Sequence, residues 1–430
     1  MKLFFKNTYL PHFSSSLDYP FFYSTYYATK TFPIFSKQEE EFLRHLTSLH
    51  NQKQLTPPSL PQKSSYKTKL LNLELKLLTT SLEKIPPHNF SIPFYAPAVL
   101  KAKYLYLNAL ILAYKTDLDT ATKDLTKALK IYKKHKYFFE CGQCYIELSK
   151  IYKICGCFDI TTTLLLEALK IFSNLIFVPQ KIAEIKAYLG LNELQYENNS
   201  NAISYLKEAI TLSEQHNLPT TLANTKNWLS LAYFLNKDNT SALTTLNSIS
   251  SQNLPLPTQL FKQELLARLN KDTSPDIALK HLNKALKIAQ TLNNTQELFE
   301  LNFLKAEIYY STSNYPKSIT ILTNLINQKT PHNALYFKAN AYSLLGLIAL
   351  KQNNLKRAKN LFKSSLDLEL SKSRFSAISM DYNNLAEVEK LKNNPSTYKQ
   401  YLKLALDFAK SSNDPKLIQY LEEKLSPHTP

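Results

Sequence analysis

The stretch "LLGLIALKQNNLKRAKNLFKSSL", residues 344–366, contains one of only four glycines in a chain of 430 residues. Ala358 follows Gly346 by twelve residues, and Phe362 follows it by sixteen. The same two steps taken from Gly190 again reach first a small residue and then a large apolar one. This recurrence predicts an internal repeat, which has to be identified before other features are interpreted.

The spacing can be followed through eight registers, whose first positions are called anchors here. Successive anchors are 36 to 41 residues apart, and seven of the eight are small: Ala109, Ser149, Gly190, Ser230, Leu266, Ala306, Gly346 and Ala386. The positions twelve residues later are Ala121, Thr161, Ala202, Ala242, Ala278, Ser318, Ala358 and Tyr398. The positions sixteen residues later are all large and apolar: Leu125, Leu165, Leu206, Leu246, Leu282, Leu322, Phe362 and Leu402. Nineteen residues after the anchor, five of the eight positions are alanine.

Helix packing explains the pattern. Two helices reach the lower end of the ~8–10 Å range of interaxial distances only where the facing residues are small. Glycine inside a helix costs about 1 kcal/mol against alanine, so close packing at Gly346 must offset that cost. Aliphatic residues recur at three and four positions rather than two, which indicates helices. The sequence therefore predicts an all-α, right-handed α-solenoid of about eight helix hairpins, each about 40 residues long.

Composition excludes several classes of protein. The chain is too long for one compact core, since cores stop growing near ~250–300 residues. Four glycines cannot supply a G-x-G-x-x-G or Walker loop, which excludes the commonest nucleotide-binding motifs. No apolar run approaches the ~20 residues of a membrane span, so no membrane partner is expected. G-x-S-x-G and H-E-x-x-H motifs are also missing from the sequence, and we expect neither enzymatic activity nor a cofactor.

Four expected regions divide the chain. Residues 1–35 are rich in aromatic side chains, and residues 36–97 read as helices with proline-rich loops. Residues 98–412 carry the eight repeats, and residues 413–430 read as a capping helix and tail. The first region holds little acid and no arginine, so a targeting signal and a packing segment both stay open.

Four cysteines lie within seventeen residues, at Cys141, Cys144, Cys155 and Cys157. Their C-x2-C-x10-C-x-C spacing is compatible with a zinc site. The intervening residues have helical periodicity, however, and eleven residues of helix separate two of the thiols by roughly 16 Å. One zinc ion needs sulfur atoms at ~2.3 Å, so we expect no metal and interpret the cysteines as buried small residues.

Two kinds of interaction surface are expected. In stacked helix hairpins the first helices line a groove, which suits an extended peptide. Counted from the anchors, the expected groove residues are Tyr106, Leu110, Lys150, Lys153, Leu191, Gln195, Asn227, Leu231, Phe234, Phe303, Glu307, Tyr310, Leu347, Asn383 and Glu387. The second kind is basic, in a chain of formal net charge +18: Lys123, Lys127, Lys130, Lys133, Lys134, Lys351, Lys356, Arg357, Lys359 and Lys363. These clusters are either solvated outer faces or docking sites for an acidic or phosphorylated partner, and direct contact with nucleic acid stays open.

The repeat pattern resembles the tetratricopeptide repeat (TPR), whose basic form has ~34 residues. Within that class, residues 99–152, "LLNLELKLLTTSLEKIPP" and "FAKSSNDPKLIQYLEEKL" resemble the adaptor subunit of the cohesin loader. The resemblance implies a non-catalytic nuclear scaffold that enfolds the extended N-terminus of the large helical-repeat loader subunit. Through it the protein would act indirectly on cohesin and chromatin, in cohesin loading and sister-chromatid cohesion.

Two alternatives from other classes stay open. One is a peptide-binding TPR regulator in the cytoplasm. The other is a basic helical-repeat protein that binds RNA in an organelle such as the mitochondrion, which the net charge favours. The missing base-reading pattern within the repeats disfavours this second alternative.

Overall fold

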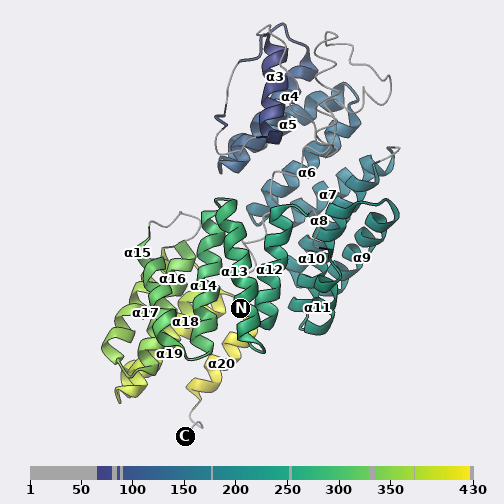
Figure 1. Ribbon diagram of the computed structural model, residues 1–430. Coiled ribbons are helices and arrows are strands. Elements are labelled where there is room, and N and C mark those ends of the chain that lie inside the picture. The colour runs from purple at the N-terminus through teal and green to yellow at the C-terminus, as the bar shows by residue number, and fades with distance from the viewer. Residues whose placement is uncertain are drawn as a thin grey trace. The chain divides into compact units, whose positions relative to one another are not determined.

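The computed structural model (Figure 1) describes residues 65–79, 85–87, 91–175, 178–250, 254–328, 335–371 and 373–426. Within these ranges every regular element is a helix. The chain divides between Ile249 and Ser250 into two compact units, called unit 1 and unit 2. The aromatic segment 1–35 and the first part of the expected region 36–97, up to residue 64, lie outside the described residues.

Unit 1 contains a leading helix, α3 (Tyr66–Thr79), and four helix hairpins. Each hairpin consists of two consecutive helices that pack along each other. The helices are α4 (Ala98–Tyr114), α5 (Leu118–Lys134), α6 (Phe138–Ile154), α7 (Phe158–Ser173), α8 (Pro179–Glu193), α9 (Asn199–Gln215), α10 (Pro219–Leu235) and α11 (Asn239–Asn247). A short 3-10 turn, η3 (Leu194–Tyr196), follows α8.

Unit 2 contains four further hairpins and a final helix, stacked side by side in Figure 1. They are α12 (Leu256–Asn270), α13 (Pro275–Thr291), α14 (Thr295–Ser311), α15 (Tyr315–Asn327), α16 (Leu335–Lys351), α17 (Leu355–Leu370), α18 (Phe375–Leu391), α19 (Pro395–Ser411) and α20 (Pro415–Leu425). Helix α20 packs on α19 and buries Leu421 against Ala405 and Ala409. The predicted α-solenoid of helix hairpins with a capping helix is therefore confirmed.

The residues that define the repeat spacing are buried where the two helices of a hairpin meet, as predicted. All eight apolar residues sixteen positions after the anchors are buried, and so are seven of the eight residues at twelve positions, Tyr398 being half-buried. At Gly346 an added Cβ atom would lie 2.6 Å from Cε1 of Phe362, which shows how closely α16 and α17 approach. Two hydroxyls at twelve positions donate to the anchor's carbonyl oxygen: Ser318 Oγ lies 2.9 Å from the oxygen of Ala306, and Thr161 Oγ1 lies 3.4 Å from that of Ser149.

The turns use left-handed backbone conformations, and only one of them is supplied by a glycine. Gly156 has φ +76°, whereas eleven non-glycine residues in the described ranges also have positive φ, five of them asparagines. Asparagine tolerates this region better than most residues, but a β-branched residue such as Thr116, at φ 68°, does so poorly. The turn at Thr116 is therefore strained.

Replacement of Thr116 by glycine is expected to stabilise the protein by about 0.5–1 kcal/mol, because glycine adopts positive φ without the Cβ clash. Thermal unfolding monitored by circular dichroism measures the change. The matched control is Thr126→Gly, an exposed position inside α5, where the same substitution should destabilise by about 1 kcal/mol. A loss of stability in Thr116→Gly would contradict the assignment of strain.

The four cysteines fall into two pairs. Cys141 and Cys144 are buried on α6, as predicted, and burial raises the pKa of the Cys141 thiol to about 12. Cys155 and Cys157 are exposed, so the prediction that all four are buried was wrong for these two. The reason is that α6 ends at Ile154, and the turn through Gly156 carries both thiols away from the helix packing.

Two kinds of feature are missing from the described part of the chain. In those ranges no three His, Cys, Asp or Glu side chains are grouped closely enough to hold a metal ion. None of the helices described there is both long and apolar enough to cross a membrane.

Candidate functional site

Taken together, the first helices of the hairpins carry most of the buried charge in both units. First helices also pack against the first helix of the next hairpin, as α8 does on α10 and α14 does on α16. Buried charged side chains lie on α4, α6, α8, α12, α14 and α18, whereas among the second helices they lie only on α5 and α17. The first-helix face is therefore the unusual one chemically, and it is also the face on which a partner was expected.

The structure places the fifteen expected groove residues at two depths. Eight of them are buried: Tyr106, Leu110, Lys150, Leu191, Asn227, Leu231, Phe303 and Asn383. Seven are partly exposed: Lys153, Gln195, Phe234, Glu307, Tyr310, Leu347 and Glu387. They belong to both units, and their joint role as a partner-binding groove stays a prediction.

In unit 1 two buried lysines on first helices are paired with carboxylates. The Lys150 ammonium lies 2.9 Å from Oε1 of Glu147, and Nζ of Lys181 lies 2.8 Å from Oε2 of Glu184. Burial lowers the pKa of Lys150, but the Glu147 carboxylate more than offsets this and leaves that pKa above its usual value. Lys153 has no such compensation, and burial lowers its pKa to about 8. Unit 1 thus holds its inner cations mostly through neighbouring carboxylates.

In unit 2 the capping helix contacts two of the expected groove residues. Nζ of Lys424 on α20 donates to Oδ1 of Asn383 at 2.9 Å and to Oε1 of Glu387 at 2.6 Å. Both acceptors lie on α18, so α20 joins the last first helix through a charged hydrogen-bond network. These two side chains already have a partner within the chain.

The basic cluster of α5 forms a stripe on its exposed face. Lys123, Lys127, Lys130 and Lys134 recur at intervals of four, three and four residues and are all exposed. The acidic residue among them, Asp124, is buried and accepts from Nδ2 of Asn108 at 2.9 Å, so it does not lie among these lysines at the surface. Lys133 differs, because its ammonium sits 5.0 Å from the centre of the Tyr145 ring.

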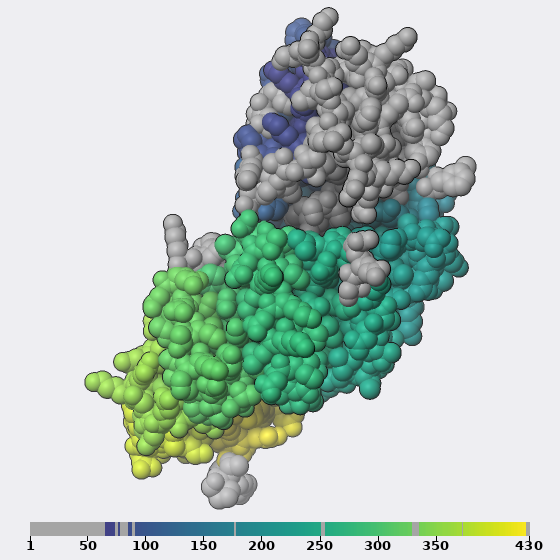
Figure 2. All heavy atoms as spheres, viewed as in Figure 1, coloured from purple at the N-terminus to yellow at the C-terminus, as the bar shows by residue number. Residues whose placement is uncertain are grey.

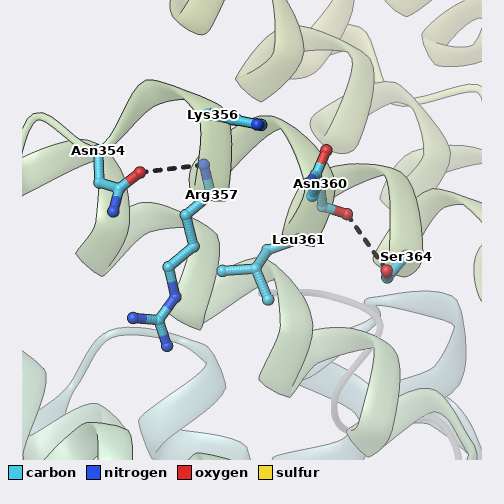
Figure 3. Close-up of a pocket in the computed structure, with 6 residues that line it drawn as sticks. All are labelled: Asn354, Lys356, Arg357, Asn360, Leu361 and Ser364. Atoms are coloured by element: carbon cyan, nitrogen blue, oxygen red, sulfur yellow. Dashed lines mark hydrogen bonds between the residues drawn. The ribbon is translucent and has the colours of Figure 1, made fainter.

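The second basic cluster surrounds a hollow of about 340 Å³ on α17 (Figure 3). Its lining consists of Asn354, Lys356, Arg357, Asn360, Leu361 and Ser364. Asn354 caps the helix by accepting from the backbone N–H of Arg357 at 3.1 Å, and the two basic side chains point in different directions from the helix. Figure 2 shows unit 2, green to yellow, as a closely packed surface.

One member of this cluster is already engaged. Lys359 is half-buried, and its ammonium lies 2.6 Å from Oε1 of Glu389 on α18. The hydrogen bond that Lys359 donates to Glu389 raises the pKa of Lys359. Lys351, Lys356, Arg357 and Lys363 are exposed and make up the solvent-facing part of the cluster.

Sequence reasoning missed the charged residues that sit deepest in unit 2. Arg268 on α12 donates to Oε1 of Glu264 at 2.7 Å and to Oε1 of Glu300 at 2.5 Å. Glu300 lies six residues before its anchor, and that position is polar in six of the eight repeats: Lys103, Gln143, Glu184, Asn224, Glu300 and Asn340. This recurrence of a polar residue at one helical position was the signal in the sequence that could have located Glu300.

Comparison with known proteins gives one family and a group of similar folds. Residues 259–380, which run from α12 into α18, match the model of the cohesin loading factor family. No curated protein matches the chain significantly.

Two solved structures have a similar fold. The apo form of the quorum sensor NprR from B. thuringiensis is 14% identical, with a TM-score of 0.59 over 86% of this chain and 97% of that chain. The signal transduction ATPase PH0952 from Pyrococcus horikoshii, which has a tetratricopeptide repeat sensor, is 15% identical, with a TM-score of 0.53 over 97% of this chain and 65% of that chain. The chain is therefore a TPR-like α-solenoid that resembles the cohesin loading factors over residues 259–380.

Proposed function

We propose that this protein is a non-catalytic adaptor of cohesin loading, which acts in the nucleus. It enfolds the extended N-terminal segment of a large helical-repeat loader subunit and so supports sister-chromatid cohesion. The observation that carries the proposal is the match of residues 259–380 to the cohesin loading factor family. That stretch contains five complete helices, α13 to α17, and therefore covers most of unit 2 rather than an isolated motif.

The first-helix faces supply the surface that the proposal needs. An extended segment is held by pockets for alternate side chains together with polar groups that fix its register. Phe234, Tyr310 and Leu347 are partly exposed apolar or aromatic side chains on these helices, and Glu307 is a partly exposed polar one. Gln195, also polar and partly exposed, lies in the 3-10 turn that follows α8. This mixture fits a peptide chain better than a small molecule, which requires an enclosed apolar pocket.

Affinity purification of the tagged protein from its own cells, followed by mass spectrometry, tests the proposal. We expect a near-stoichiometric large helical-repeat protein together with cohesin subunits. Recovery with RNA would instead favour the organellar alternative, and recovery with a short peptide would favour the cytoplasmic regulator. Either of those outcomes, or recovery of the protein alone, would overturn the adaptor function.

The exposed cluster around the hollow on α17 is proposed as a docking patch for an acidic or phosphorylated chromosomal partner. Charge reversal at Lys356, Arg357 and Lys363 should leave folding intact and reduce chromatin association at least fivefold, because all three side chains are exposed. Chromatin fractionation measures the effect. The control reverses Lys399, Lys403 and Lys410, three exposed lysines of α19 that give the same change in net charge. Equal behaviour of the two triple variants would remove the patch from the proposal.

A further inference from the structure

The first-helix face of unit 2 holds more buried acid than base. Five carboxyl groups, four on first helices and one on the second helix α17, are gathered around two guanidinium groups. We call this set the acidic cluster, and its members are Glu264, Glu297, Glu300, Glu369 and Asp381, together with Arg268 and Arg374. In a chain of formal net charge +18, such a local excess of acid is unexpected.

Tyr336 on α16 lies between the two halves of the cluster. On one side, Arg268 bridges Glu264 and Glu300. On the other side, Nη1 of Arg374 lies 3.0 Å from Oε1 of Glu369, and the Arg374 guanidinium sits 5.3 Å from the centre of the Tyr336 ring. The charges of both halves act on the Tyr336 hydroxyl, so the cluster is one continuous polar region.

Several buried acceptors in this region are unpaired. Oε2 of Glu300 and Oε2 of Glu369 accept no hydrogen bond from any residue that the structure describes, although both side chains are only 2% exposed. The Tyr336 hydroxyl also has no hydrogen-bond partner among those residues. Buried carboxylate oxygens without donors are unfavourable, and native proteins rarely leave them so. The two guanidinium groups are too few for the five carboxyls.

The protonation of the cluster also reflects a shortage of positive charge. Burial raises the pKa of Glu369 and of Asp381 to about 7. Burial and the neighbouring carboxylates raise the pKa of Glu297 and of Glu300 well above the usual value. A further cation would favour the ionised form of each group.

Unit 1 provides an internal comparison. Its first helices carry three buried lysines, Lys103, Lys150 and Lys181, and two buried glutamates, Glu140 and Glu147. Buried cations exceed buried anions by one there, whereas in the acidic cluster the anions exceed the cations by three. The excess of acid is thus a property of unit 2 and not of the repeat.

We propose that the acidic cluster binds the arginine side chain of an extended peptide segment supplied by a partner protein. A guanidinium carries five donors in a planar fork that matches carboxylate oxygens and also stacks on aromatic rings, so it would satisfy Glu300 and Glu369 beside Tyr336. The cluster is not sealed: Glu297 and Tyr336 are half-buried, and the Arg268 and Arg374 side chains are 11% and 18% exposed. The inference rests on the proposed function, since it names what the held segment presents to unit 2.

The test is direct peptide binding to the full chain, measured by fluorescence anisotropy. The probe is a labelled synthetic peptide of alternating alanine and arginine, and its control carries citrulline, a neutral isostere, at each arginine. We expect the arginine peptide to bind at least tenfold more tightly, because positive charge elsewhere on the chain repels it and leaves the acidic cluster as its site. Equal binding of the two peptides would overturn the proposal.

Variants locate the binding. The double variant Glu300→Gln and Glu369→Gln keeps shape and removes two negative charges, and should weaken arginine-peptide binding at least fivefold. The matched control is Glu422→Gln with Glu423→Gln, two exposed glutamates of α20. Unchanged affinity in the first double variant, or an equal loss in the second, would contradict the assignment.

The pH dependence of the wild-type chain keeps the test valid even if the first double variant fails to fold. Arg374 faces Glu369 and Asp381, and the Ser343 and Ser365 hydroxyls also face Asp381. As these carboxyls ionise, binding of the arginine peptide should strengthen at least threefold between pH 6 and pH 8, while citrulline-peptide binding should not change. A flat profile for the arginine peptide would overturn the proposal.

The two proposals fail separately. Arginine-peptide binding uses the purified chain and no loader subunit. Binding of that peptide without recovery of a large helical-repeat partner from cells would overturn the adaptor function alone. Recovery of that partner without arginine-peptide binding would overturn the arginine site alone.

Discussion

Replacement of Gly346 by valine should destabilise unit 2 by about 3 kcal/mol, measured by urea unfolding. A Cβ atom at this position would lie 2.6, 2.8 and 2.9 Å from three ring carbons of Phe362, and that ring is fully buried. Valine adds two methyl groups beyond the Cβ atom, and overpacking of this kind typically costs 1–3 kcal/mol, occasionally more. Replacing glycine by alanine inside a helix recovers ~1 kcal/mol of helix propensity, but a β-branched residue such as valine recovers only part of it.

A double-mutant cycle tests the physical reason. Gly346→Ala and Phe362→Leu should each destabilise, the first by crowding the ring and the second by leaving a cavity. Together they recreate the Ala306 and Leu322 pair of the neighbouring repeat, so the combined loss should be smaller than the sum by about 1 kcal/mol or more. Strictly additive losses would show that the glycine does not act through close contact with the ring.

Replacement of Arg268 by methionine should cost about 3–5 kcal/mol at pH 8, because it leaves Glu264 and Glu300 buried without their guanidinium. Burial already raises the pKa of Glu300, and loss of Arg268 raises it further. A carboxyl whose folded pKa lies above its unfolded value destabilises the fold as pH rises past the unfolded value of ~4.3. The deficit should therefore be smallest near pH 5 and largest above pH 8.

Two controls accompany this prediction. Arg357→Met changes an exposed arginine in the same unit and should alter stability by less than about 0.5 kcal/mol. Adding Glu300→Gln to the Arg268→Met background should recover part of the loss at pH 8, because it removes one uncompensated charge. A deficit of the same size at pH 5 and pH 8 would mean that the lost packing, and not the buried charge, causes it.

The sequence by itself was enough to predict the helix hairpins, for a physical reason. Close approach of two helices requires small residues at fixed separations, and this constraint is local to about twenty residues, as in the Gly346, Ala358 and Phe362 series. The constraint recurs in most of the repeats, so it stands out although the repeats share little else. Resemblance to the cohesin loader adaptor came from similarly local stretches.

Only the tertiary structure decided which charged residues are available. In the sequence, Lys359 looks like its neighbours in the basic cluster, but packing of α17 on α18 pairs it with Glu389. Glu387 resembles a free groove residue until α20 brings Lys424 to it. Cys155 and Cys157 appear to continue a buried helix, but the helix ends just before them.

The acidic cluster is the clearest case of a feature that packing decides and local sequence does not. Glu264, Glu300 and Asp381 are separated by 36 and 81 residues in the sequence, and no local spacing relates them. They come into one polar region because successive first helices stack with their inner faces side by side. The period of small residues, a local property, determined the hairpins. The charge balance of the inner face is a sum over several repeats, and it exists only once they are packed together.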